Sequence, residues 1–223
     1  MSNEDFPKLS AADDDPGAPR PGEISETADL ESARALANIG APAEGASPLP
    51  PQAPAPGETP LLDIDFSHAE AFLNACETCT PRVTYGLGKK VPFLGAVPGH
   101  DFTQVDCSGF VREAIRVSTN PPIPFPDGSV TQHDWVDARG FGKSTVAAAM
   151  ANDGMMRVAF LRPQDVPSGI GHVVLIVAGR TLESHGGTGP DSRPWTGASW
   201  QAKTFVYDLA KQAPLVTAAG LGG

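Results

Sequence analysis

The chain has 223 residues, of which 40% are hydrophobic and 19% charged, and its formal net charge at pH 7 is −10. Most of that charge lies in residues 1–60, which hold 11 acidic and three basic side chains and 11 of the 23 prolines. No apolar run approaches the roughly 20 residues that span a bilayer, so we expect no membrane partner. An acidic chain without a Lys/Arg cluster also argues against nucleic acid as the main partner.

Residues 1–60 are rich in Ala, Pro, Gly, Asp and Glu, a composition that buries too little apolar surface to fold alone. We expect a disordered tail here and one domain over residues 61–223. Residues 26–39 have a weak apolar stripe, but an isolated helix of that length is marginal in water. A fraying spacer is therefore favoured over a helix that docks a partner. The first residues lack a basic segment followed by an apolar run, so we expect no secretory signal peptide.

Two helices are predicted in the first half of the domain. Ser67 and Glu70 have the spacing of a capping box and precede an apolar stripe, so a helix should start there and end near residues 79–81. Asp106 is a suitable N-cap for a second helix, from residue 107 to about 117, whose apolar residues would form a buried stripe.

The last third of the sequence is typical of short β-strands, rich in Val, Ile and Phe and separated by Gly or Pro. We expect strands at residues 157–161, 172–177, 181–185 and 204–209. A short helix is expected within 145–152, and 121–128 reads as an extended loop. Helices followed by an antiparallel sheet indicate an α+β domain.

Cys107 stands one residue after the predicted N-cap, in the hexamer D-C-S-G-F-V of residues 106–111. Unpaired N–H groups and the macrodipole at a helix N-terminus stabilise a thiolate, the reactive form of a cysteine nucleophile. Gly109 removes side-chain bulk where a substrate backbone could approach. The alternative is a small buried apolar residue, which most free cysteines are, and Cys107 alone favours that alternative.

His172 favours the catalytic interpretation. It follows a glycine at the start of an apolar strand, where a side chain can face a cleft while the rest of the strand is buried. A tight turn at residues 178–180 would bring His185 back beside it, and cross-strand Cβ atoms lie about 5 Å apart. One imidazole could then hydrogen-bond the other, which gives the nucleophile, base and orienting residue of a catalytic triad.

Together these residues resemble the NlpC/P60 branch of the papain-like cysteine peptidases. The likeness rests on the hexamer 106–111 and on G-H-V at 171–173, and it covers about residues 67–209. The stretch Y-G-L-G at 85–88 is similar to the family's Tyr-x-x-Gly-Gly, although the second glycine is absent. The resemblance implies a papain-like NlpC/P60 fold with N-terminal helices packed on a small antiparallel β-sheet. The CHAP amidases, with their own Cys and Gly-His pair, are the nearest alternative among enzymes.

The resemblance also implies a role for each motif residue. Cys107 would attack an amide carbonyl, His172 would hold it as a thiolate–imidazolium pair and protonate the leaving amine, and His185 would orient His172. The Tyr85 hydroxyl would support the oxyanion beside the Cys107 N–H. No metal and no other cofactor are expected. The positions expected to bind substrate are Asp106, Ser108 and, in an apparent insertion at 121–144, Trp135.

The family's usual substrate is the cell-wall stem peptide, cut between D-glutamate and diaminopimelate. We therefore expect a peptidoglycan hydrolase made in the cytoplasm and, with no export signal visible, an antibacterial effector injected into a rival's periplasm by a contractile secretion system. Its partners would be a secretion-system component that binds the tail and an immunity protein. The alternatives are a phage tail or lysis hydrolase, a non-catalytic binding module of the same fold, and a papain-like deamidase or acyltransferase acting on a protein.

Cys76 and Cys79 form a Cys-x-x-Cys pair, which is typical of some metal and redox sites. A zinc site needs four ligands, and Cys76 faces the predicted core, so packing is favoured over a disulfide or a metal. The remaining histidines and tryptophans are not expected to be catalytic. We expect surface or loop positions for His68, His100 and His133, and core or cleft-rim positions for Trp195 and Trp200.

Overall fold

The structure of the protein is a computed structural model that describes residues 60–211. Its centre is an antiparallel sheet of six strands in the order β3-β8-β4-β5-β6-β7. The strands are β3 (Lys143–Ser144), β4 (Met155–Leu161), β5 (His172–Val177), β6 (Arg180–His185), β7 (Gly189–Asp191) and β8 (Phe205–Lys211). A separate parallel pair joins β1 (Thr84–Tyr85) to β2 (Gln104–Val105).

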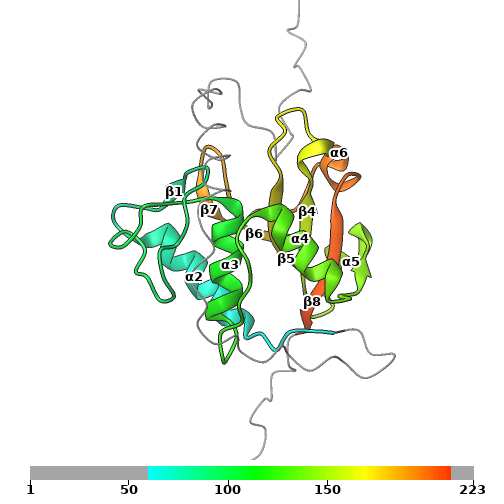
Figure 1. Cartoon of the computed structure of the whole chain (residues 1–223), viewed down its shortest axis with the longest axis horizontal. Coiled ribbons are helices and arrows are strands. Elements are labelled where there is room, and N and C mark those ends of the chain that lie inside the picture. Colours follow the sequence, from blue (N-terminus) through cyan, green and yellow to red (C-terminus); the bar gives the residue numbers. More distant parts are fainter. Residues whose placement is uncertain (1–59, 212–223) are drawn as a thin grey trace, which may run out of the picture.

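Helices lie on both sides of this sheet (Figure 1). They are α2 (Phe66–Thr78), α3 (Cys107–Val117), α4 (Ser129–Ala138), α5 (Val146–Met150) and α6 (Ala198–Gln201), with a 3-10 turn at Pro163–Asp165. Helix α3 packs against α2, β5 and β6, whereas α5 packs against β5. Helices and an antiparallel sheet in one unit confirm the expected α+β class.

Two hydrophobic clusters hold the central strands from opposite faces. On β5, Val173 and Leu175 belong to the larger cluster under α2 and α3, while Val174 and Ile176 belong to a smaller cluster with Trp195 and Trp200. Because successive strand residues point to opposite faces, burial of both faces explains the unbroken apolar run in β5. The strand is thereby fixed on both sides, and so is the His172 position at its start.

Helix α3 has the predicted bounds, and its N-cap is Asp106, whose Oδ1 accepts a hydrogen bond from the Gly109 N–H at 2.7 Å. The capping box predicted for α2 is wrong. The helix begins one residue earlier, at Phe66, and its N-cap is Asp65, whose Oδ1 accepts from the Ser67 N–H at 3.0 Å. An aspartate caps as well as a serine, and the earlier start also buries Phe66 in the core.

All four predicted strands are present, and β5 has the predicted bounds. A two-residue turn joins β5 to β6, with Val177 paired to Arg180. Both turn residues have positive φ, 48° at Ala178 and 73° at Gly179, as in the turns that match the twist of a hairpin. This turn sets the register that places the side chains of β6.

The segment 121–144, expected as an insertion with an extended loop at 121–128, contains helix α4 after that loop. Few residues of this helix are apolar, and its buried positions are Gln132 and Val136. His133, expected on the surface, instead packs edge-on against Phe160 and Tyr207 beneath the helix. Strand β7 was likewise not predicted, whereas the short helix expected within 145–152 is present as α5.

The tail predicted over residues 1–60 and the weak helix at 26–39 concern residues 1–59, which lie outside the described part of the chain. Within residues 60–211, no helix is long and apolar enough to cross a membrane.

Candidate active site

Cys107 is the first residue of α3, so its backbone N–H lies in the turn whose N–H groups have no partner inside the helix. Its side chain is buried, with 5% of the residue's surface exposed. The Cys107 side chain lies near enough to His172 to raise the pKa of the imidazole. The structure therefore brings together the two residues that the sequence motifs singled out 65 positions apart.

His172 begins β5 and is fixed on its other side by a carboxylate. Its Nε2 lies 2.7 Å from Glu183 Oε2, so Nδ1 is the ring nitrogen that the carboxylate leaves unbound. Trp200 approaches the ring edge-on, with centroids 6.2 Å apart. A histidine held at one nitrogen by an acceptor presents the other in a defined orientation and tautomer.

The charges around His172 favour its protonated form. Burial alone would lower the pKa of His172, but the negative charge and hydrogen bond of Cys107, followed by those of Glu183, raise it to about 10. Burial would likewise raise the pKa of Glu183, but the hydrogen bonds and charges of His172 and then Arg193 lower it to about 2. At neutral pH the site therefore holds an imidazolium beside a carboxylate, and a cation next to a cysteine is the setting of an activated cysteine nucleophile.

The expected hydrogen bond between His185 and His172 is not formed. The β5–β6 pairing runs from Val177 back only to Leu175, and beyond it β6 pairs with β7. His185 Nε2 lies 3.0 Å from both carboxylate oxygens of Asp191 on β7, and its Nδ1 lies 2.9 Å from the Gly186 carbonyl. A carboxylate on the neighbouring strand thus holds His185, and the residue beside His172 is Glu183.

Glu183 was not predicted as a site residue, although the sequence carried a signal for it. It is the acidic residue of a strand with a buried middle, two positions before His185, and the period of two puts both residues on one face of β6. With 2% of its surface exposed, Glu183 is among the most buried charged residues of the described chain. Such a group needs partners of opposite charge.

Tyr85, expected to support the oxyanion, lies in β1 beside the nucleophile. Burial raises the pKa of its phenol, and the negative charges of Cys107 and then Asp106 raise it further. The hydroxyl consequently stays protonated at neutral pH, as a hydrogen-bond donor must.

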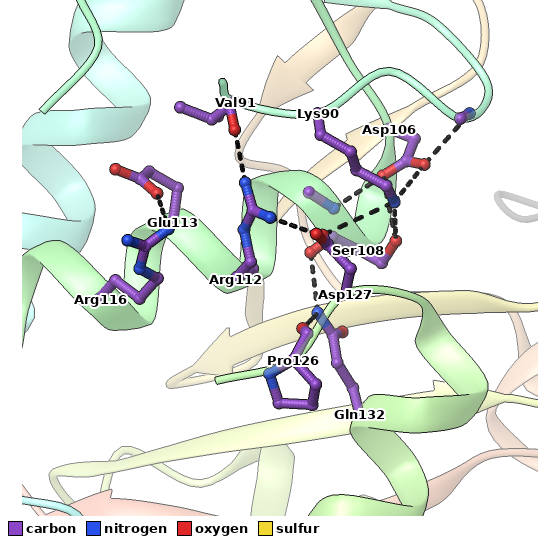
Figure 2. A network of polar contacts seen from close by, with 12 residues as sticks. Lys90, Val91, Asp106, Ser108, Arg112, Glu113, Arg116, Pro126, Asp127 and Gln132 are labelled. Atoms are coloured by element: carbon purple, nitrogen blue, oxygen red, sulfur yellow. Dashed lines mark hydrogen bonds and ion pairs between the residues drawn. The ribbon is translucent and has the colours of Figure 1, made fainter. Parts of the chain in front are cut away.

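Asp106 and Ser108, expected to bind substrate, are instead fastened inside the protein (Figure 2). Lys90 Nζ donates to both Asp106 oxygens, at 2.8 and 2.6 Å, and to Ser108 Oγ at 2.6 Å. The Gly88 N–H donates to Asp106 Oδ2 at 3.1 Å, and Gly109 occupies Oδ1. Because these contacts satisfy both buried side chains, they fix the start of α3 rather than offer groups to a ligand.

Two further contacts in Figure 2 tie surrounding loops to α3. Arg112 donates to the Val91 carbonyl at 2.5 Å and pairs with Asp127. Gln132 Nε2 donates at 2.8 Å to the Ser108 carbonyl, directly after the nucleophile. The loop before α3 and the helix after it thus both hold the first turn in place.

Trp135, the third expected substrate-binding residue, lies on α4 and packs against two aromatic residues that flank the helix in sequence. Its ring centroid lies 5.0 Å from that of Phe125 and 5.8 Å from that of Phe141, and the Arg139 guanidinium lies 3.9 Å above it. These contacts give Trp135 a role in attaching α4 to the core.

Gly171 lies directly before His172 in a tight space. A Cβ atom there would lie 2.9 Å from Ser129 Oγ and 3.0 Å from the Leu161 carbonyl oxygen. Glycine therefore allows α4 and β4 to approach the start of β5, and this approach helps to fix His172.

The other cysteines behave as packing residues. Cys76 and Cys79 are free thiols, Cys76 is fully buried in the larger hydrophobic cluster, and Cys79 Sγ donates to the carbonyls of Cys76 and Pro81. In residues 60–211, no group of three or more His, Cys, Asp or Glu side chains is arranged to hold a metal ion.

No protein-family model and no curated protein matches the sequence. Among solved structures, one match is a Staphylococcus aureus protein described as similar to lipoprotein, NLP/P60 family. The two chains are 14% identical with a TM-score of 0.43, and the match covers 70% of this chain and 45% of the other's length.

Proposed function

We propose that the protein is a cysteine hydrolase that cleaves an amide bond in a peptidoglycan stem peptide. The observation that carries the proposal is the Cys107–His172–Glu183 arrangement, in which a helix N-terminus, an imidazole and a buried carboxylate activate one thiol.

The proposed reaction has two stages. The Cys107 thiolate attacks the amide carbon, and the resulting oxyanion is stabilised by the Cys107 N–H and the Tyr85 hydroxyl. The imidazolium of His172 gives its Nδ1 proton to the leaving amine as the C–N bond breaks. His172 then takes a proton from water, which attacks the thioester, and the C–S bond breaks to release the acid and regenerate the thiolate.

The choice of substrate rests on the sequence motifs that resemble the NlpC/P60 peptidases, whose usual target is the bond between D-glutamate and diaminopimelate. Injection into a rival cell, an immunity protein and a secretion-system partner for the N-terminal segment are further parts of this proposal. The adjacent gene offers a test of them, because an injected toxin should be accompanied by a small antidote protein.

The test of the hydrolase proposal is incubation of the purified full-length protein with peptidoglycan and analysis of the muropeptides by mass spectrometry. We expect new fragments cut within the stem peptide, and none with Cys107→Ala. A Cys79→Ala variant is the matched control, since it removes a thiol whose partners are the Cys76 and Pro81 carbonyls, and it should leave the fragments unchanged. Unchanged muropeptides, or cleavage that survives Cys107→Ala, would remove the proposal.

A further inference from the structure

Glu183 has a second charged partner on the side away from His172. Its Oε2 meets the imidazole, and its Oε1 accepts a hydrogen bond from Arg193 Nε at 2.9 Å. The Arg193 side chain is 28% exposed and the Glu183 side chain 2%. The guanidinium thus covers the carboxylate from the solvent side.

The four groups alternate in charge. In the proposed active form, the thiolate of Cys107, the imidazolium of His172, the carboxylate of Glu183 and the guanidinium of Arg193 follow one another, and their formal charges cancel. Without the guanidinium, the three inner groups would leave one net negative charge in a buried environment. Such a charge is costly unless it is paired or neutralised by a proton.

We propose that Arg193 is a positioning residue for catalysis, which keeps Glu183 ionised and oriented and so keeps Cys107 and His172 in the thiolate–imidazolium form. This inference rests on the hydrolase proposal. It extends the site by one residue that acts through Glu183.

Backbone contacts fasten the segment around Arg193 to β6. The Thr181 N–H donates to the Arg193 carbonyl at 2.9 Å, and the Arg193 N–H donates to Thr181 Oγ1 at 3.4 Å. A bridge between Arg180 and Pro194 and the hydrogen bonds from Arg180 to Ser192 add to these contacts. A change of the Arg193 side chain therefore leaves the backbone of the segment anchored to β6.

Other titratable groups near the four are protonated or paired among themselves. Tyr85 faces the nucleophile with a raised pKa, caused by burial and then by the charge of Cys107. Asp106 is bonded to Lys90, and His185 to Asp191. Arg193 is therefore the cation that balances Glu183 on its outer side.

Removal of the Arg193 charge should make the three remaining groups, Cys107, His172 and Glu183, take up a proton near neutral pH. If Cys107 takes the proton, the nucleophile is lost directly. If Glu183 takes it, the neutral carboxyl no longer stabilises the imidazolium, which returns its proton to the thiolate. Both routes lower the thiolate fraction, so the pH at which Cys107 becomes reactive should rise.

The test measures how the rate of Cys107 alkylation by iodoacetamide depends on pH, followed on the peptide that contains Cys107 in the full-length protein. We expect Arg193→Met to move the midpoint upward by about one pH unit or more, and so to slow alkylation about tenfold below the midpoint. Arg193→Lys keeps the charge and should move the profile back toward wild type. Arg193→Gln keeps hydrogen-bond donors without charge and should behave like Arg193→Met.

Arg180→Met is the matched control, because Arg180 is an exposed arginine that bonds the same segment through Ser192 but contacts no carboxylate at the site. The pH dependence of Cys107 alkylation in this variant should equal that of the wild-type protein. The inference is overturned if His172→Ala and Glu183→Gln alter the profile while Arg193→Met and Arg193→Gln do not, or if Arg180→Met shifts it equally. If even His172→Ala leaves the profile unchanged, the hydrolase proposal itself fails, and the role of Arg193 fails with it.

Discussion

Replacement of Glu183 by glutamine tests which residue completes the site. Glutamine keeps the shape of the side chain and an oxygen that can accept from His172, but it removes the charge. The pKa of Glu183 is lowered from 4.5 to about 2, which corresponds to ~3 kcal/mol of net stabilisation of the carboxylate by its surroundings. That stabilisation is shared between His172 and Arg193.

A hydrogen bond to a charged group contributes about 1.5–3 kcal/mol, so the share lost at His172 should lower kcat/KM by about 10–100-fold. The assay is the release of muropeptide fragments at neutral pH over a range of substrate concentrations, with thermal unfolding measured in parallel. We expect the loss mainly in kcat, because Glu183 supports the charge state of the reacting pair and does not touch substrate.

His185→Gln is the control for this prediction. It stands two residues away on the same strand, it is bonded to Asp191 rather than to His172, and its replacement should change kcat less than about threefold. If His185→Gln lowered kcat as much as Glu183→Gln does, or if Glu183→Gln had no effect, the assignment of Glu183 as the orienting residue would be refuted.

Three other predictions concern stability. Because the pKa of Glu183 is lowered on folding, the carboxylate should contribute ~3 kcal/mol to the free energy of unfolding above about pH 4.5, and this contribution should disappear as the pH falls toward 2. In urea unfolding, the stability of Glu183→Gln should therefore fall less steeply with acid than that of wild type. An identical fall in the two proteins would contradict the lowered pKa. Gly171→Ala should destabilise the fold by about 1–3 kcal/mol, because the added Cβ meets Ser129; an unchanged Tm would show that the space is not tight. Lys90→Met should lower the free energy of unfolding by about 3 kcal/mol, because it leaves the Asp106 carboxylate buried without its cation. The double variant with Asp106→Asn should recover part of this stability. Strictly additive losses from the two changes would argue against the pairing.

The parts of the fold that could be predicted are those whose signals are local. Helix α3 followed from one N-cap and one apolar stripe, and β5 from an apolar run between a glycine and a tight turn. Helix α4 was missed because its buried positions include the polar Gln132, whose partners, the carbonyls of Ser108 and Pro126, come from other segments. No apolar period marks such a helix in the sequence.

The residues of the site likewise divide into those that local sequence signals predict and those that depend on the pairing of distant segments. The spacing of the motifs predicted Cys107 and His172, but the third residue depended on where the β5–β6 pairing ends. Counting residues outward from the β5–β6 turn places His172 opposite His185. The count takes no account of β7, which was not predicted and which supplies Asp191 as the partner of His185. The Arg193 contact likewise depends on a segment that folds back onto β6, and nothing in the local sequence indicates that return.

The central claim is that His172 keeps Cys107 ionised, and the rate of Cys107 alkylation near pH 6 in wild type and His172→Ala tests it most directly. An ordinary thiol is less than about 1% ionised at that pH, so pairing with an imidazolium should make the wild-type protein react up to about 100-fold faster than the variant. Equal rates in the two proteins, with both folded, would contradict the account.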